Sequence, residues 1–146
     1  MKYLTKKPEE TKKIAKELAK KILKNGPAKN AFVLGLEGDL GSGKTTFLQG
    51  FALGLGVEEK ILSPTFVIMK RFEILNLGFN NFFHIDCYRL KNPKELLDLG
   101  FKQILKNPQN IVAVEWAEKV KKILPESAIF IKFKFVSKNK REISFC

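Results

Sequence analysis

A glycine-rich stretch in the first half of the chain has the spacing of a phosphate-binding loop. Gly38 is followed by four residues and then by Gly43, Lys44 and Thr45. In this pattern backbone N–H groups surround the phosphates, the lysine reaches the β- and γ-phosphates, and the hydroxyl ligates Mg²⁺. The sequence therefore predicts a nucleotide site. The residues expected to contact the nucleotide here are Gly38, Asp39, Leu40, Gly41, Ser42, Gly43, Lys44, Thr45 and Thr46.

Two acidic residues follow apolar runs elsewhere in the chain. Asp86 comes directly after Phe82–Ile85, and Glu115 comes directly after Ile111–Val114. In open α/β sheets the chemistry collects at the carboxyl ends of the strands. Either carboxylate can hold Mg²⁺, hold its water ligands or orient an attacking water, and the alternative is an acid that only caps a helix or turn. We expect Lys44, Asp86 and Glu115 to be catalytic and Thr45, Asp86 and Glu115 to be metal ligands, with the division between the two acids left open by their spacing.

Four further side chains are candidates for a role at the site. His84 is a base or relay, or a histidine that is simply hydrogen-bonded in place. Thr65 is a switch threonine that senses the γ-phosphate, or a residue at a strand entrance. Trp116 covers the nucleotide, docks a partner or belongs to the core. Arg89 is the best placed arginine to offset charge that develops during phosphoryl transfer.

The elements that position these residues follow from hydrophobic periodicity and from glycine and proline signals. Residues 31–36 read as a strand and residues 45–53 as a helix that stops around Gly54 and Gly56, so that the glycine-rich turn and a helix N-terminus meet. The other expected elements are a helix from residue 8 to 25, strands at 66–69 and 82–88 joined by a turn at 76–81, helical pieces at 93–100, 101–105 and 117–124, a strand at 111–114 and a hairpin of 129–135 with 141–145. Together they predict an α/β chain with a three-layer P-loop NTPase-like fold, in which a mixed sheet carries antiparallel hairpins, as a single domain over residues 1–146.

Composition bounds the remaining function classes. The chain has 146 residues, a net charge of +12 and two cysteines. Two cysteines make no disulfide framework, no apolar run approaches a membrane span, and the polar N-terminus does not resemble a signal peptide, so a cytoplasmic location without a membrane partner is expected. The charge favours a polyanionic partner such as RNA, although lysines on solvated faces give the same balance, and the sequence shows no base-reading motif.

Four motifs, taken in order, resemble the TsaE (YjeE) family over nearly the whole chain. They are residues 36–46, Ser-Pro-Thr-Phe at 63–66, His-Ile-Asp-Cys-Tyr-Arg-Leu at 84–90 and Val-Glu-Trp at 114–116. The resemblance implies an ATPase that acts in making threonylcarbamoyladenosine in tRNA, that binds the TsaB–TsaD complex and that resets this complex by hydrolysing ATP.

The resemblance also implies roles for individual residues. Thr45 and Glu115 match residues that contact Mg²⁺, and Asp86 matches an aspartate needed for activity. Trp116 matches a tryptophan beside the nucleotide site, and Thr11 matches a serine or threonine of the first helix that approaches the nucleotide. Contact with tRNA would be indirect through the complex. Direct contact, the oligomeric state, the docking surface and any catalytic group from a partner stay open.

Three rival functions differ in testable features. A small-molecule kinase of this type usually gathers several arginines around the transferred phosphoryl group, and this chain has only Arg71, Arg89 and Arg141. A GTPase needs an Asn-Lys-x-Asp motif, which residues 139–142 fail to complete at the last position. A non-catalytic nucleotide-sensing or RNA-binding module is supported mainly by the charge, and ATP turnover would separate it from the enzymes.

Overall fold

The computed structural model describes residues 1–39, 41–61 and 68–145, and within these residues seven strands form one mixed sheet. The order across the sheet is β1-β7-β6-β2-β5-β4-β3. The strands are β1 (Lys2–Thr5), β2 (Phe32–Glu37), β3 (Met69–Asn76), β4 (Phe79–Asp86), β5 (Asn110–Glu115), β6 (Ile129–Ser137) and β7 (Lys140–Phe145). The predicted mixed sheet is confirmed.

The middle of the sheet is a parallel block. β2 pairs in parallel with β5 and β6, and β5 pairs in parallel with β4, while β3, β7 and β1 join through antiparallel pairings. Both predicted hairpins, β3–β4 and β6–β7, are therefore present, but the bounds of the first were wrong: β3 continues to Asn76, well past the predicted end at 69, and β4 begins at Phe79, inside the predicted turn at 76–81. Parallel strands that share a register end at the same edge, and here Leu36 and Asp86 both lie opposite Glu115. The two predicted acidic residues and the start of the phosphate loop are thus neighbours.

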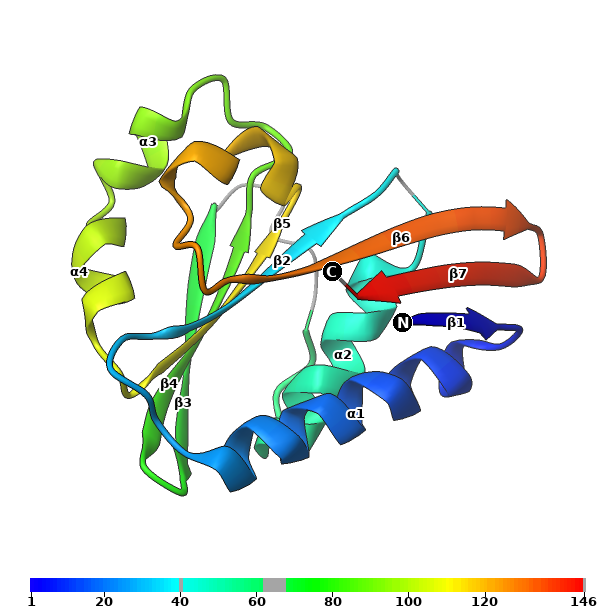
Figure 1. The fold of residues 1–146 in the computed structure, drawn as a ribbon, viewed down its shortest axis with the longest axis horizontal. Helices are drawn as coiled ribbons and strands as arrows, with labels where there is room; N and C mark the ends of the chain where they lie inside the picture. The colour runs from blue at the N-terminus through cyan, green and yellow to red at the C-terminus, as the bar shows by residue number, and fades with distance from the viewer. Residues whose placement is uncertain (40, 62–67, 146) are drawn as a thin grey trace.

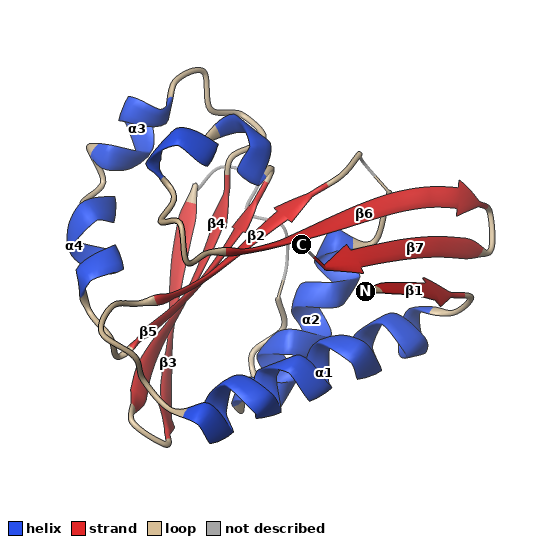
Figure 2. Cartoon of the chain, in the orientation of Figure 1, coloured by secondary structure: helices blue, strands red, loops and turns tan. Residues whose placement is uncertain are grey.

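Helices cover both faces of the sheet and make three layers. α1 (Pro8–Asn25) and α2 (Lys44–Leu55) lie on one face, and α3 (Pro93–Leu97) and α4 (Phe101–Lys106) lie on the other, as Figures 1 and 2 show. Successive side chains of β5 point to opposite faces of the sheet, so this strand contributes to the hydrophobic core on each face. Ile111 and Ala113 pack toward α1 and α2, whereas Val112 and Val114 pack toward Phe101 and the short helices. The three-layer α/β prediction is confirmed.

Two glycines allow α1 and α2 to approach closely. A Cβ added to Gly50 would lie 2.4 Å from the carbonyl oxygen of Lys12, and one added to Gly54 would lie 2.7 Å from Cβ of Ala19. Gly54 is therefore inside α2, and the prediction that the helix stops around Gly54 and Gly56 is correct only for Gly56, which is its left-handed C-cap at φ 91°. The glycine that looked like a stop signal is used for packing.

Two parts of the fold differ from the prediction, and one predicted segment lies outside the described residues. β1 was not predicted, because its four residues, three of them exposed, carry little periodic signal; it is held by its antiparallel pairing with β7 and, at Thr5, by a hydrogen bond from Thr11. Residues 117–124 form two 3-10 turns, η1 (Ala117–Lys119) and η2 (Lys121–Ile123), and not one helix, since Val120 between them has a non-helical backbone at φ −126° and ψ 18°. The predicted strand start at 66 and the Ser-Pro-Thr-Phe motif lie outside the described residues. Among the residues described, no helix is long and apolar enough to cross a membrane.

Replacing Gly50 with alanine should destabilise the fold. The added methyl group meets the backbone of α1 at Lys12, which cannot move aside as a side chain can. We expect a loss of about 1–3 kcal/mol in the free energy of unfolding, even though alanine is the better helix former by about 1 kcal/mol. Urea unfolding measures it. Leu53→Ala, at a 52% exposed position of the same helix, is the matched control, and an unchanged midpoint for Gly50→Ala would contradict the close packing.

Candidate active site

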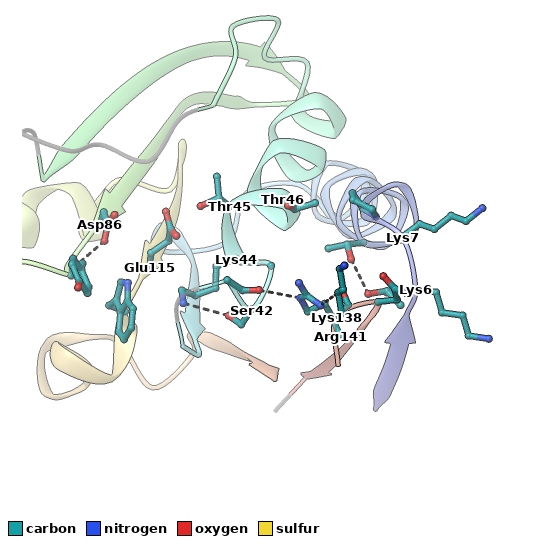
Figure 3. Close-up of a pocket in the computed structure, with 18 of the residues that line it drawn as sticks. Lys6, Lys7, Ser42, Lys44, Thr45, Thr46, Asp86, Glu115, Lys138 and Arg141 are labelled. Carbon is teal, nitrogen blue, oxygen red and sulfur yellow. Dashed lines mark hydrogen bonds between the residues drawn. The ribbon is translucent and has the colours of Figure 1, made fainter. Parts of the chain in front are cut away.

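A cavity of about 750 Å³ opens at the carboxyl edge of the parallel strands. Its walls come from the phosphate loop, the start of α1, the ends of β4 and β5, and the turn between β6 and β7. Figure 3 shows Asp86 and Glu115 on one side of Lys44 and Thr45, with Lys138 and Arg141 on the other side. The volume is in the range of small-molecule sites, and the position is the one where open α/β sheets bind ligands.

The phosphate loop depends on glycines at its two ends. Gly38 has φ 145°, and a Cβ there would lie 2.5 Å from the carbonyl oxygen of Phe133 in β6. Gly43 has φ 104° and is the N-cap of α2, whose first turn closes through the bond from the N–H of Phe47 to the Gly43 carbonyl at 2.9 Å. Only glycine fits both requirements without strain. The loop therefore enters against β6 and leaves directly into a helix N-terminus, an arrangement suited to an anion.

Lys44 is a nearly buried cation. Its side chain is 5% exposed, and Nζ donates to the carbonyls of Gly38 and Asp39, the latter at 2.9 Å. Nζ also lies 4.3 Å from the ring centroid of Trp116, a cation–π distance. Burial lowers the pKa of Lys44, and nearby carboxylates, led by Glu115, oppose that shift. The loop thus holds an ammonium group beside the N–H groups that would face phosphates.

The two predicted acids lie side by side at the ends of β4 and β5. Glu115 is 3% exposed and its Oε2 accepts a hydrogen bond from Nε2 of His84 at 2.6 Å. Asp86 is half-buried and its Oδ1 accepts from the N–H of Tyr88 at 3.0 Å. Burial raises the pKa of Asp86, the Tyr88 hydrogen bond lowers it, and the neighbouring Glu115 raises it further. A cation placed between these carboxylates would relieve their repulsion.

His84 has a supporting position. It is 1% exposed, lies beneath Glu115, and is not among the described residues that line the cavity. Of the two interpretations, the structure favours the histidine hydrogen-bonded in place over the base or relay. By fixing one carboxylate oxygen of Glu115 from below, His84 sets the direction of the other, as partners of ligating carboxylates commonly do.

The remaining predicted residues fall into two groups. Trp116, Thr11, Thr46 and Arg89 line the cavity. Trp116 has a left-handed backbone, with φ 57°, and its ring lies 5.1 Å from that of Tyr88; such strain in a bulky residue is typical of functional sites. Leu40 and Thr65 lie outside the described residues.

Hydrogen bonding joins Thr11 to the end of β1. Its Oγ1 donates to Oγ1 of Thr5 at 2.9 Å, and both threonines are buried. The bond fixes the start of α1 beside the strand that precedes it. This contact brings the first helix to the wall of the cavity.

Sequence reasoning missed a group of basic residues on the far wall of the cavity. They are Lys6, Lys7, Lys138 and Arg141. From the sequence, Arg141 counts only as one of three scattered arginines and as part of an incomplete GTPase motif in a hairpin turn. The strand order is what places these residues. Because β6 lies next to β2 and runs parallel to it, the turn that follows β6 must lie on the same side of the sheet as the phosphate loop. That adjacency cannot be read from local periodicity.

Comparison with known proteins points to one family. The family profile described as threonylcarbamoyl adenosine biosynthesis protein TsaE matches residues 5–143. The tRNA threonylcarbamoyladenosine biosynthesis protein TsaE of Bacillus subtilis is 42% identical over 145 residues, which cover 99% of this chain and 84% of that protein. The protein of the same name from Rickettsia felis is 36% identical over 134 residues, which cover 91% and 72%. The crystal structure of Bacillus subtilis YdiB matches with a TM-score of 0.73 at 39% identity, covering 99% of this chain and 83% of that one.

Neutralising Asp86 should stabilise the fold while damaging the site. A carboxyl whose pKa is raised by folding costs stability above its ordinary pKa of 3.8, and that cost disappears as the pH falls below it. Asp86→Asn keeps an oxygen for the Tyr88 N–H and removes the charge. At pH 7 we expect a higher melting temperature and a gain of less than about 1 kcal/mol in the free energy of unfolding, because water screens a half-buried group. Near pH 3 we expect no difference.

Asp98→Asn, an equal charge change at an exposed position, controls for the net charge of the protein. Scanning calorimetry at the two pH values measures the effect. A lower melting temperature for Asp86→Asn at pH 7 than for the control would contradict the assignment of an unfavourable buried charge.

Proposed function

The chain belongs to the TsaE family, which acts in tRNA threonylcarbamoyladenosine biosynthesis, and we propose that it serves there by binding and hydrolysing ATP with Mg²⁺ in the cavity at the strand ends. The observation that carries this proposal is the buried ammonium of Lys44 in a glycine-rich loop, with two carboxylates at the adjoining strand ends. The loop supplies an anion site, and the carboxylates supply a cation site next to it.

The donor set fits Mg²⁺ that is shared with phosphates. Asp86 and Glu115 are register partners on neighbouring strands, and the hydroxyl of Thr45 lines the same cavity. Magnesium in nucleotide sites takes one or two carboxylates together with phosphate oxygens and water. Among the described residues no group of three or more His, Cys, Asp or Glu side chains could hold a metal. We therefore assign Thr45, Glu115 and Asp86 as the residues that would hold it, with the nucleotide completing the shell.

Hydrolysis on this scaffold is a matter of positioning and charge. The bound metal ion would neutralise charge on the β- and γ-phosphates. Lys44 exchanges its bonds to the Gly38 and Asp39 carbonyls for phosphate oxygens, and the loop N–H groups hold the β-phosphate in line. Asp86, at the end of the strand beside Glu115, organises the metal's water ligands or orients the water that attacks the γ-phosphorus as ADP leaves. Trp116 and Tyr88, whose ring centroids are 5.1 Å apart, both line the cavity and would shield bound phosphates from bulk water.

The family role supports a partner-dependent activity. We propose that the chain, as one cytoplasmic domain, acts with the TsaB–TsaD complex and reaches tRNA through it. Arg89 lines the cavity and follows Asp86 by three positions in the chain, and Arg141 lies on the wall opposite Asp86. One arginine beside the two carboxylates offsets little of the negative charge that develops during phosphoryl transfer. Basal turnover should therefore be slow, and a partner should complete the site.

A small-molecule kinase is the second candidate, favoured by the size of the cavity alone. It would transfer the γ-phosphate to an acceptor other than water. An assay that follows phosphate release and phosphorylated products in parallel separates the two.

Variants of the loop lysine and the buried glutamate should fail at different steps. Lys44→Ala should abolish nucleotide binding, and turnover with it, because the ammonium contributes to holding the phosphates themselves. Glu115→Gln should spare binding and lower turnover about 100-fold, since it removes charge at the metal position but keeps an oxygen for His84.

Calorimetric titration with ADP and release of phosphate from ATP measure the two steps. Glu126→Gln, exposed and remote from the cavity, is the control. Wild-type turnover in a Glu115→Gln preparation would contradict the assignment of Glu115 as a ligand of Mg²⁺.

Partners should accelerate turnover. We expect slow phosphate release from ATP by the purified chain, and a rise of tenfold or more when TsaB, TsaD and tRNA are added together. Leaving out each component in turn shows which one acts. A basal rate that none of them changes would count against the role with that complex, while leaving the ATPase itself in place.

A further inference from the structure

The side chain of Arg141 joins the β6–β7 hairpin to the phosphate loop. Its Nε donates to the carbonyl oxygen of Gly41 at 3.0 Å, across 100 positions of sequence. We propose that Arg141 is a positioning residue, which holds the centre of the loop in the conformation that receives phosphate. This inference rests on the proposed nucleotide site and adds a residue to it.

The loop around Gly41 needs such a contact because side-chain packing does not hold it. Gly41 is exposed, has φ 76°, and a Cβ built on it would meet no atom within 4 Å. The carbonyl of Gly41 and the N–H of Ser42 belong to one planar peptide group. The carbonyl is held by Arg141, and the N–H donates to the carbonyl of Asp39 at 3.2 Å. Two hydrogen bonds on opposite sides therefore fix this peptide plane, and with it the direction of the N–H groups that follow.

Arg141 is itself held firmly enough to act as a support. Its Nη1 donates to the carbonyl oxygens of Ser137 at 2.9 Å and Lys140 at 3.2 Å, and its guanidinium lies 4.5 Å from the ring centroid of Phe135. The planar guanidinium donates hydrogen bonds to the hairpin from Nη1 and to the loop from Nε. A lysine at this position would offer one charged nitrogen and no such fork.

The hairpin that carries Arg141 is anchored to the strand that leads into the loop. β6 pairs in parallel with β2 up to the partners Glu37 and Lys132. Immediately beyond, Gly38 passes so close to Phe133 that only glycine fits. The loop is thus attached to the hairpin at its entrance through the backbone and at its centre through Arg141. Figure 3 shows the Arg141 side chain reaching toward the loop from the wall opposite Asp86 and Glu115.

The test separates positioning from simple charge. ADP affinity is measured by calorimetry for wild type, Arg141→Lys and Arg141→Gln. The control is Lys140→Gln, which removes one positive charge at the neighbouring exposed position, as Arg141→Gln does at 141. Positioning predicts that both Arg141 variants bind ADP about tenfold more weakly, while Lys140→Gln stays within twofold. Wild-type affinity in Arg141→Lys would overturn the proposal, because the charge alone would then suffice.

A second measurement needs no nucleotide. Hydrogen–deuterium exchange of the amides at 41–43 should be faster in Arg141→Lys than in wild type, with the melting temperature unchanged within about 2 °C. Exchange equal to wild type would overturn the inference. If wild type itself binds no ADP, the proposed function fails, and the exchange result still decides whether Arg141 holds the loop.

Discussion

A buried positive charge is the constraint around which this site is built. Lys44 is 5% exposed, and an ammonium removed from water is unfavourable unless other groups replace its hydration. The protein supplies carbonyls from the loop and the face of Trp116, whose backbone is left-handed to place the ring there. Glu115 and Asp86 balance the charge at longer range. These acids also repel each other, so the whole arrangement is best satisfied by an anion and a cation bound together, as a metal nucleotide is.

The fold brings these groups together through the parallel block of the sheet. β2, β4 and β5 each end at the same edge and contribute the loop, Asp86 and Glu115. Two further sets of contacts hold the loop in place. The Gly50 and Gly54 contacts fix α2 against α1, and Phe47 in the first turn of α2 packs against Phe133 of β6, with ring centroids 5.3 Å apart. The loop is therefore supported from the helical layer and from β6.

Much of the site could be predicted from sequence because its signals are local. The loop has a fixed spacing, and an acid that ends an apolar strand can be placed at the ligand edge once the sheet is known to be parallel. The missed parts depend on distance in sequence. Arg141 meets Gly41 only because β6 lies next to β2. His84 meets Glu115 only because β4 and β5 pair in one register. Gly54 has the local pattern of a helix stop, and only its contact with Ala19 shows that it is a packing position.

The central claim is that this cavity binds a magnesium nucleotide, and the most direct test uses the protein's single tryptophan. Trp116 lies against Lys44 and lines the cavity, so its fluorescence should report occupancy. Titration with ADP and with ATP, each with and without Mg²⁺, should give a saturable change that Lys44→Ala abolishes. No change with any of these nucleotides at millimolar concentration, together with no heat of binding in calorimetry, would contradict the account.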